Sequence, residues 1–286
     1  MKYKIGILGQ GYVGKAISEA FSKHFQHLNT YDKYISKYSS VNSLEELTKK
    51  SEIIFICLPT PMKNNGECFT GIVEEEIQKI NQISNASDEK IVVIKSTVPP
   101  GTSSNIGKKN TNINVIFNPE FLTEKNYIED FQNQEKVIIG GYDKNNKLEK
   151  LYKHVFPNIR VLKCSQEEAE MVKYIINTFL AMKVSYANEL KILCDKLKIN
   201  YDTVSEIAQF DKRVGYSHWK VPGPDGKMGF GGSCFPKDIN ALIYIAKQNN
   251  IKLDLLTEAW ELNLKVRPEE DWKKLVGRSV LDTKKI

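Results

Sequence analysis

KIGILGQGYVGKAISEAF, residues 4–21, starts with a short apolar run, passes through a glycine-rich turn and ends in apolar residues at helical spacing. The turn has the form Gly-x-Gly-x-x-Gly, in which glycines permit a sharp bend and a close backbone approach to a pyrophosphate. The amides and the dipole at the start of the following helix favour negative charge. The stretch therefore predicts a strand, a phosphate-binding turn and a helix.

The next predicted strand, residues 28–31, is followed by Asp32, which lies about 20 residues past the turn. An acid at this place accepts hydrogen bonds from the adenosine ribose and repels a 2′-phosphate, so the pattern favours NAD over NADP. The candidate cofactor residues in this region are Gly9, Gly11, Tyr12, Val13, Gly14 and Asp32. The alternative is a glycine turn that binds no dinucleotide, with Asp32 merely capping the next segment.

Further apolar runs predict four more strands, at residues 53–57, 91–94, 115–117 and 137–139. Runs without polar alternation are typical of parallel strands that are covered on both faces. We therefore expect an α/β fold, with a Rossmann-type, doubly wound parallel sheet over residues 1–164. An all-α helical domain is expected over residues 165–286.

The second half begins with a capping box, Ser165 with Glu168, and a long helical pattern follows. Lys173 and Asn177 are four residues apart, so both project from one face of that helix and can meet one ligand. The alternative is an ordinary solvated polar face. Six glycines between residues 215 and 232 predict a loop without helix or strand.

GFGGSCFPKD, residues 229–238, places a thiol between flexible glycines and two opposite charges. A cysteine taken by itself is usually a small buried residue. A structural cysteine needs neither of these neighbours, whereas a nucleophile works as a thiolate and benefits from a nearby cation. Cys234 is therefore a candidate nucleophile.

Composition limits the class of protein. The 286 residues include 41% hydrophobic and 27% charged residues, as in folded proteins that bury a core. The net charge is +6 with lysines scattered among acids, which gives little support to nucleic-acid binding. Five widely spaced cysteines without CxxC pairs argue against a disulfide framework and a zinc site. No apolar run approaches the roughly 20 residues of a membrane span, and no signal peptide is evident, so we expect a cytoplasmic protein.

Seven segments occur in an order that resembles the UDP-glucose/GDP-mannose dehydrogenase family over nearly the whole chain. They are GQGYVG with Asp32, PTP (59–61), KSTVPPGT (95–102), NPEFLTE (118–124), EMVKYIINTFLAMKVSYANEL (170–190), FDKRVG (210–215) and GFGGSCFPKD. The resemblance implies oxidation of the C6 alcohol of a nucleotide sugar to a carboxylate. This four-electron reaction uses two NAD and passes through a cysteine-bound intermediate.

The resemblance also implies roles for individual residues. Cys234 would attack the aldehyde as a thiolate, giving a thiohemiacetal and then a thioester. Lys173 would face the developing oxyanion, and Asn177 would donate a hydrogen bond or hold a water. Asp238 would help to position Lys173 or the hydrolytic water, and Glu120 with Thr97 would act in acid/base catalysis and water positioning.

Two further sets follow from the resemblance. The expected cofactor residues outside the glycine turn are Pro59, Thr60, Thr97 and Glu124. The expected substrate residues are Glu120, Phe121, Leu122, Lys173, Asn177, Arg213 and Gly231. We also expect a homodimer through the helical half, with Arg213 reaching the partner's substrate.

The chain departs from the family in two places. It ends near where the family's third, nucleotide-binding domain begins, so we expect a short form. The loop at residues 216–227 is longer than usual, and we expect His218, Trp219 and Lys220 to supply stacking and charge to the substrate. Two other functions stay open: a β-hydroxyacid dehydrogenase that transfers one hydride, which needs no cysteine, and a cofactor-binding remnant that acts with a partner.

Overall fold

The computed structural model describes residues 3–282 of the chain, which forms two compact units. The first unit comprises the chain up to Thr60 together with Thr70–Lys173. The second comprises Pro61–Phe69 and the chain from Tyr174 onward. The domain boundary predicted between residues 164 and 165 stays a prediction.

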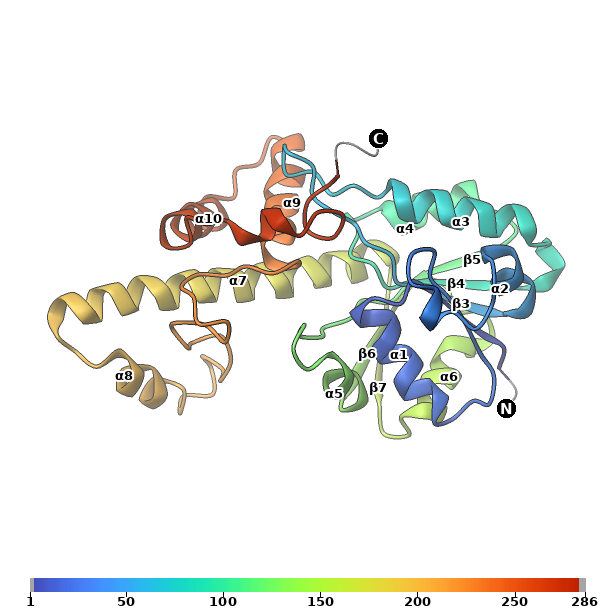
Figure 1. Ribbon diagram of the computed structural model, residues 1–286, viewed down its shortest axis with the longest axis horizontal. Coiled ribbons are helices and arrows are strands. Elements are labelled where there is room, and N and C mark those ends of the chain that lie inside the picture. Colours follow the sequence, from blue (N-terminus) through green and yellow to red (C-terminus); the bar gives the residue numbers. More distant parts are fainter. Residues whose placement is uncertain (1–2, 283–286) are drawn as a thin grey trace. The chain divides into compact units, whose positions relative to one another are not determined.

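The first unit contains a seven-stranded sheet in the order β2-β1-β3-β4-β5-β6-β7 (Figure 1). Its strands are β1 (Ile5–Leu8), β2 (Leu28–Tyr31), β3 (Ile53–Ile56), β4 (Ile91–Ile94), β5 (Asn114–Phe117), β6 (Lys136–Gly140) and β7 (Arg160–Cys164). The predicted α/β fold is confirmed, because β1 to β5 pair in parallel and four of these strands are almost wholly buried.

One pair of neighbours departs from the parallel expectation. β5 and β6 are antiparallel and meet at a single pair, Phe117 with Gly140, whereas β6 and β7 are parallel again. A parallel neighbour needs a crossover that returns the chain to the starting edge of the sheet. The connection after β5 contains only the six-residue helix α5 (Tyr127–Gln132) and does not return the chain in this way.

Helices cover both faces of the sheet (Figure 1). One face carries α1 (Tyr12–Ser22), α5 and α6 (Lys147–Val155). The other carries α2 (Leu44–Lys50), α3 (Gly71–Ile83) and α4 (Thr102–Lys109). On the first face the ring of Phe21 meets Phe55 edge-on at 5.6 Å and Phe131 at 6.1 Å, so aromatic side chains join α1 and α5 to the strands.

The long helix α7 (Gln166–Leu197) begins in the first unit. Its predicted capping box is confirmed, because the Glu168 N–H donates to the Ser165 hydroxyl (3.2 Å) and the Ser165 N–H donates to the Glu168 carboxylate (2.8 Å). Glu170, near the start of the same helix, is fully buried and accepts the N–H groups of Gly101 (2.6 Å) and Ser103 (2.7 Å). Its carboxyl group therefore caps the start of α4, and burial raises its pKa to about 7.

The second unit is helical. It contains the rest of α7, together with α8 (Tyr201–Ala208), α9 (Phe235–Gln248) and α10 (Asp254–Val266). Residues 215–232 form neither helix nor strand, as the glycines predicted. No helix among the described residues is long and apolar enough to cross a membrane.

Two segments distant in sequence meet in this unit. The N–H of Met62 donates to the carbonyl of Ser279 (2.8 Å), and the N–H of Leu281 donates to the carbonyl of Met62 (2.9 Å). Gly66 lies against α9, where a Cβ would come within 3.2 Å of the Asn240 carbonyl. Residues 61–69 are therefore built into the helical unit.

The expectation that Trp219 stacks on a substrate is wrong. The residue is 9% exposed and packs with Tyr201, Val221 and Ala187, and its indole N–H donates to the Gly215 carbonyl at 2.8 Å. An aromatic ring in a glycine-rich loop gains more from joining the core than from facing solvent.

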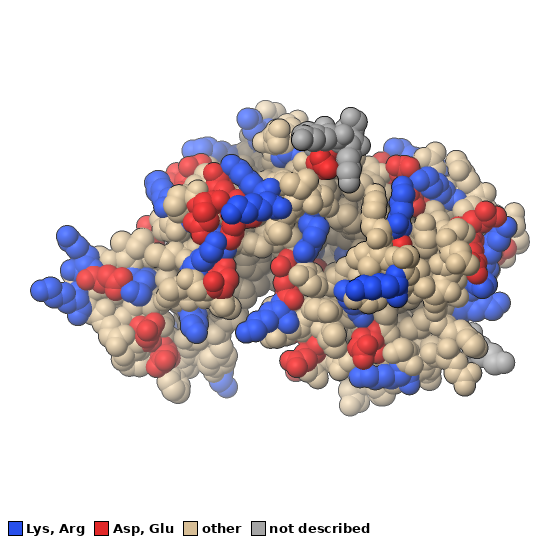
Figure 2. Space-filling model, in the orientation of Figure 1, with Lys and Arg blue, Asp and Glu red and all other residues tan. Residues whose placement is uncertain are grey.

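Cationic and anionic side chains are interspersed on the face shown in Figure 2. Many are paired one helical turn apart, as in Lys49 with Glu45, Lys79 with Glu75 and Lys153 with Glu149. Such exposed pairs are worth little individually. Their effect is to balance the surface charge locally.

Candidate functional site

The glycine turn after β1 has the geometry that a dinucleotide requires. Gly9 has φ +91°, and a Cβ there would lie 2.5 Å from the Cys57 carbonyl oxygen. A Cβ on Gly14 would lie 1.9 Å from the carbonyl oxygen of Gly9, so α1 packs against the turn only with glycine there. Gly11, just before α1, has open space where its Cβ would be. The backbone at the helix start is thus open to a pyrophosphate, and the residues fit NAD.

Asp32 is held beside this turn. Its Oδ2 accepts the N–H of Gln10 at 2.7 Å, while its Oδ1 accepts the N–H groups of Tyr34 and Ile35 at 2.9 Å each. The acid therefore caps the following segment and also links the end of β2 to the glycine turn. The bond to Gln10 places the carboxylate beside the glycine turn, and its contact with the cofactor stays a prediction.

Loops after three neighbouring strands carry other predicted residues. Thr60, after β3, is buried and its hydroxyl donates to the carbonyl of Thr97, after β4, at 2.7 Å. Pro59 beside it is exposed, as is Glu124 in the loop after β5. Thr60 and Thr97 therefore lie together at the carboxyl edge of the sheet.

Glu120 and Lys173 form a buried ion pair. The Lys173 ammonium donates to Glu120 Oε1 at 3.0 Å and to the Glu120 carbonyl at 2.6 Å, and the N–H of Leu122 donates to Oε2 at 2.7 Å. Burial opposes the charge on Glu120, but Lys173, the Leu122 N–H and Lys95 outweigh it and lower its pKa. The ring of Phe121 lies 5.4 Å from the Lys173 ammonium. The site thus holds an ionised carboxylate beside a cation.

Sequence reasoning did not single out Lys95, the first residue after β4. It is 3% exposed, and its ammonium donates to Asn118 Oδ1 (3.0 Å) and to the Pro119 carbonyl (3.2 Å). Burial lowers the pKa of Lys95 to about 8, against the opposing effect of Glu120. Perturbed groups of this kind cluster at functional sites. The sequence feature that could have identified Lys95 was its position directly after a fully apolar strand.

Cys234 lies in the second unit, at the N-cap of α9. Its carbonyl accepts the N–H of Asp238 at 2.9 Å, and its sulfur lies 3.8 Å from the Ser233 hydroxyl. A helix N-terminus favours a thiolate. Lys237 adds a cation that interacts electrostatically with Cys234. Cys57, by contrast, has its pKa raised to about 12 by burial, so it is a poor nucleophile.

Charged groups on α9 are satisfied within the same unit. Asp238, 1% exposed, accepts the side-chain N–H of Asn177 at 2.6 Å and forms an ion pair with Lys237. Burial alone would lower the pKa of Lys237, but Asp238, Cys68 and Cys234 raise it. Asn177, Asp238 and Lys237 therefore form one buried polar group, which the sequence did not predict, and the expected role of Asp238 in positioning Lys173 or a water stays a prediction.

Two other predicted substrate residues have structural partners. Arg213 is exposed, and its Nε donates to both carboxylate oxygens of Asp211, at 3.0 and 3.1 Å. Gly231 has no room for a side chain, because a Cβ would lie 2.5 Å from Arg267 Nη2. Their contact with a substrate stays a prediction.

Comparison with known proteins identifies a family. The NAD-binding domain of the UDP-glucose/GDP-mannose dehydrogenase family matches residues 28–158, and the central domain of the same family matches residues 167–265. The UDP-glucose 6-dehydrogenase of Rickettsia bellii is 40% identical over 231 residues, which cover 78% of this chain and 51% of that protein. The chain thus spans about half the length of this relative.

Two solved structures are similar over almost the whole chain. A UDP-glucose dehydrogenase from Pyrobaculum islandicum has a TM-score of 0.81 and 27% identity, covering 93% of this chain and 68% of that one. The 3-hydroxyisobutyrate dehydrogenase of Mycobacterium tuberculosis has a TM-score of 0.74, covering 94% and 95%, but its 15% identity shows the fold alone. The cofactor indicated by the matched N-terminal domain is NAD. The chain therefore belongs to the UDP-glucose/GDP-mannose dehydrogenase family.

Proposed function

We propose that the protein oxidises the C6 alcohol of a UDP-glucose-like nucleotide sugar to the uronate. Bound NAD supplies a hydride acceptor for each of two oxidations. The observation that carries the proposal is Cys234 at the start of α9, beside the Lys237–Asp238 pair. A single hydride transfer requires no thiol, whereas a second oxidation requires a nucleophile that holds the aldehyde.

The first oxidation removes a proton and a hydride from the alcohol and leaves an aldehyde. Glu120 is held as a carboxylate by Lys173 and Leu122, which makes it the proposed acceptor of the proton, directly or through a water at Thr97. The Lys173 ammonium is the proposed partner of the oxygen as negative charge develops there.

In the second oxidation the Cys234 thiolate adds to the aldehyde carbon and forms a C–S bond, giving a thiohemiacetal. The oxyanion form of this adduct loses hydride from that carbon to give a thioester, and water then cleaves the C–S bond to release the carboxylate, the thiol and a proton. Asn177 is proposed to donate a hydrogen bond to the oxygen of these intermediates. Asp238 accepts from both Asn177 and Lys237, and this supports a role in orienting them.

The test counts NADH formed per sugar consumed, with a panel of UDP- and GDP-sugars. We expect two NADH per sugar from the wild type. In Cys234→Ser we expect the second oxidation, and the NADH that it forms, to be lost. Cys164→Ser, which changes a thiol on β7, is the control and should behave as wild type.

Other outcomes favour the alternatives. One NADH per turnover of a small hydroxy acid, unaffected by Cys234→Ser, would favour the β-hydroxyacid reaction. NAD binding without turnover of any sugar would favour a remnant that acts with a partner.

We also propose a homodimer through the helical unit. Exposed apolar side chains recur at helical spacing along α7, at Ile175, Phe179, Tyr186, Leu193 and Leu197. A continuous apolar stripe of this kind is typical of an interface. Phe179→Glu should reduce the mass measured by light scattering to that of a monomer, while Lys191→Glu, on another side of the helix, should not. The cytoplasmic location and the role of Arg213 in the partner's site stay predictions.

A further inference from the structure

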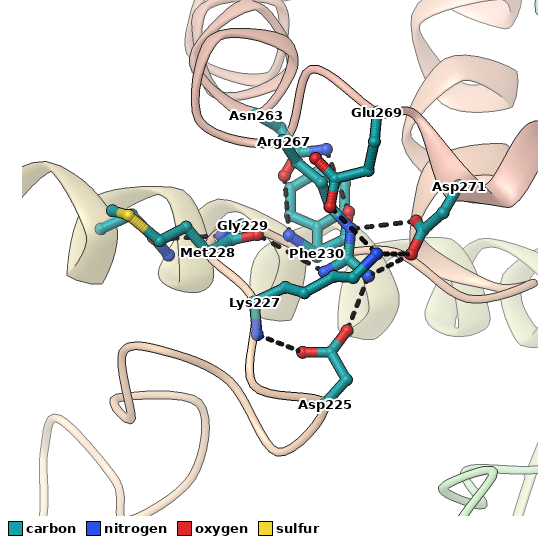
Figure 3. Close-up of polar contacts among 10 residues, drawn as sticks. Asp225, Lys227, Met228, Gly229, Phe230, Asn263, Arg267, Glu269 and Asp271 are labelled. Atoms are coloured by element: carbon teal, nitrogen blue, oxygen red, sulfur yellow. Dashed lines mark hydrogen bonds and ion pairs between the residues drawn. The ribbon is translucent and has the colours of Figure 1, made fainter.

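The loop that leads to Cys234 has no regular secondary structure, yet buried side chains hold its backbone (Figure 3). Asn263 on α10 accepts the N–H of Phe230 (2.7 Å) and donates to its carbonyl (3.0 Å). Asn188 on α7 accepts the N–H of Gly229 at 2.9 Å. Both asparagines are at most 1% exposed, so these bonds are shielded from water.

Arg267 holds the same loop from the end of α10 (Figure 3). Its side chain is 3% exposed and donates to Asp225 (2.6 Å) and to both carboxylate oxygens of Asp271 (3.0 and 2.7 Å). Lys227 adds a further ion pair to Asp271 at 2.9 Å. The guanidinium is thus fixed in place by two carboxylates, one from the loop itself.

Two glycines of the loop are explained by these side chains. A Cβ on Gly229 would lie 2.4 Å from Asn263 Oδ1. A Cβ on Gly231 would lie 2.5 Å from Arg267 Nη2 and 2.8 Å from Asp271 Oδ1. Gly231 has no left-handed backbone, so its own conformation accepts a side chain, and it is Arg267 together with its partner Asp271 that excludes one.

We propose that Asn263 and Arg267 are positioning residues for Cys234. They bind the backbone of Phe230 and Met228, and α9 fixes the chain on the other side of the thiol. A loop anchored at both ends keeps the sulfur at the helix N-terminus, where the thiolate is favoured. The inference rests on the proposed function, in which only the second oxidation uses the thiol. Loosening the loop therefore slows the second oxidation and spares the first.

The first experiment compares Asn263→Ala with Ser185→Ala. Ser185 is a matched control, because its hydroxyl makes a buried bond to the Ala259 carbonyl (2.7 Å) that joins the same two helices without touching the loop. Each buried hydrogen bond left unmade corresponds to a shift of about tenfold in an equilibrium constant. In Asn263→Ala we expect the Phe230 amide to exchange hydrogen at least about tenfold faster and the second oxidation to slow by a similar factor. Equal loss in both oxidations, or equal effects in Ser185→Ala, would overturn the proposal.

A second experiment asks whether Arg267 is the reason for glycine at 231. Gly231→Ala should impair the second oxidation in the wild type and have little additional effect in Arg267→Ala. In that background the guanidinium that the methyl strikes is gone, and the Asp271 carboxylate that it holds is released to turn away. Additive effects of the two substitutions would contradict this reading and would favour a substrate that packs on Gly231.

Alkylation of Cys234 by iodoacetamide needs no turnover, so it separates the positioning role from the proposed function. We expect at least about fivefold slower alkylation at neutral pH in Asn263→Ala than in Ser185→Ala, because the thiolate loses its fixed place at the helix start. If this difference holds while no nucleotide sugar is oxidised, the proposed function fails and the positioning role stands. Unchanged alkylation together with unchanged amide exchange would refute the positioning role whatever the substrate.

Discussion

Replacing Lys173 with methionine removes the ammonium from a buried ion pair in the NAD-binding unit. The side chains of Lys173 and Glu120 are 4% and 10% exposed, and their charged atoms are 3.0 Å apart. Without Lys173, Glu120 keeps only the Leu122 N–H and the more distant charge of Lys95. Removing one partner of such a pair costs about 3–5 kcal/mol. We expect the unfolding free energy of Lys173→Met to fall by about this amount above pH 7.

The size of this loss should depend on pH. In the wild type the pKa of Glu120 is lowered, so the carboxylate adds stability above the ordinary glutamate pKa that is lost as the pH falls through the lowered value. In Lys173→Met, burial is opposed more weakly and raises the pKa of Glu120, which then takes up a proton as the pH falls. The buried charge disappears, so the difference in unfolding free energy between wild type and variant should narrow toward about pH 4.

The assay is urea unfolding followed by far-UV circular dichroism and by exchange of the amides of β4 and β5. All three tryptophans, Trp219, Trp260 and Trp272, lie in the helical unit. The tryptophan fluorescence of the folded protein is therefore an internal control, which should be the same in Lys173→Met as in the wild type. Lys49→Met breaks an exposed pair with Glu45 and should change stability by less than about 1 kcal/mol. A loss that is equal at every pH would refute the electrostatic reasoning.

Three other predictions concern the same unit. Gly14→Ala should raise the dissociation constant of NAD at least about tenfold in a calorimetric titration, because its Cβ would lie 1.9 Å from the Gly9 carbonyl; unchanged affinity would show that α1 shifts freely. Lys95 has a pKa of about 8 in the folded protein, so above this pH it binds fewer protons in the folded than in the unfolded state. The unfolding free energy of the wild type should therefore rise from pH 8 toward pH 10, and urea titrations of Lys95→Met should lack this rise. Glu170, with a pKa of about 7, adds stability below its ordinary pKa, and this stability is lost as the pH rises through 7. The unfolding free energy of Glu170→Gln should lack this decline with pH. A decline that persists in the variant would have to come from another group.

Local sequence patterns predicted most of the sheet, because a strand buried on both faces is a run of apolar residues. β7 has no such run: Arg160 and Lys163 are exposed, and the strand was missed. The orientation of β6 was also missed, since the apolar residues of a strand are the same in either direction. Strand direction depends on the connection, and the connection through α5 has no strong pattern.

The sequence predicted those site residues that lie in recognisable motifs, but not the contacts between residues that are distant in the chain. Glu120 and Lys173 are 53 residues apart, and although the family resemblance named both residues, nothing in the sequence predicted that they form an ion pair. Asn263 and Arg267 were missed because they bind backbone groups and, in Arg267, the Asp225 carboxylate of a loop that lies 33 residues or more before them. A polar residue on an amphipathic helix gives no sign of such a partner. Lys95 was missed because burial, which shifts its pKa, is a property of the folded chain.

The nine residues from Pro61 to Phe69 belong to the helical unit although their neighbours on both sides belong to the NAD-binding unit. Neither unit is therefore encoded by one uninterrupted stretch of the gene. A recombination that exchanged NAD-binding halves between relatives at a single junction near residue 173 would carry a foreign 61–69 segment into the helical unit. That segment would have to fit Ser279 through Met62 and Asn240 through Gly66. The two halves are thus expected to be inherited together, and a working chimera should require the 61–69 segment to come from the parent that supplies the helices.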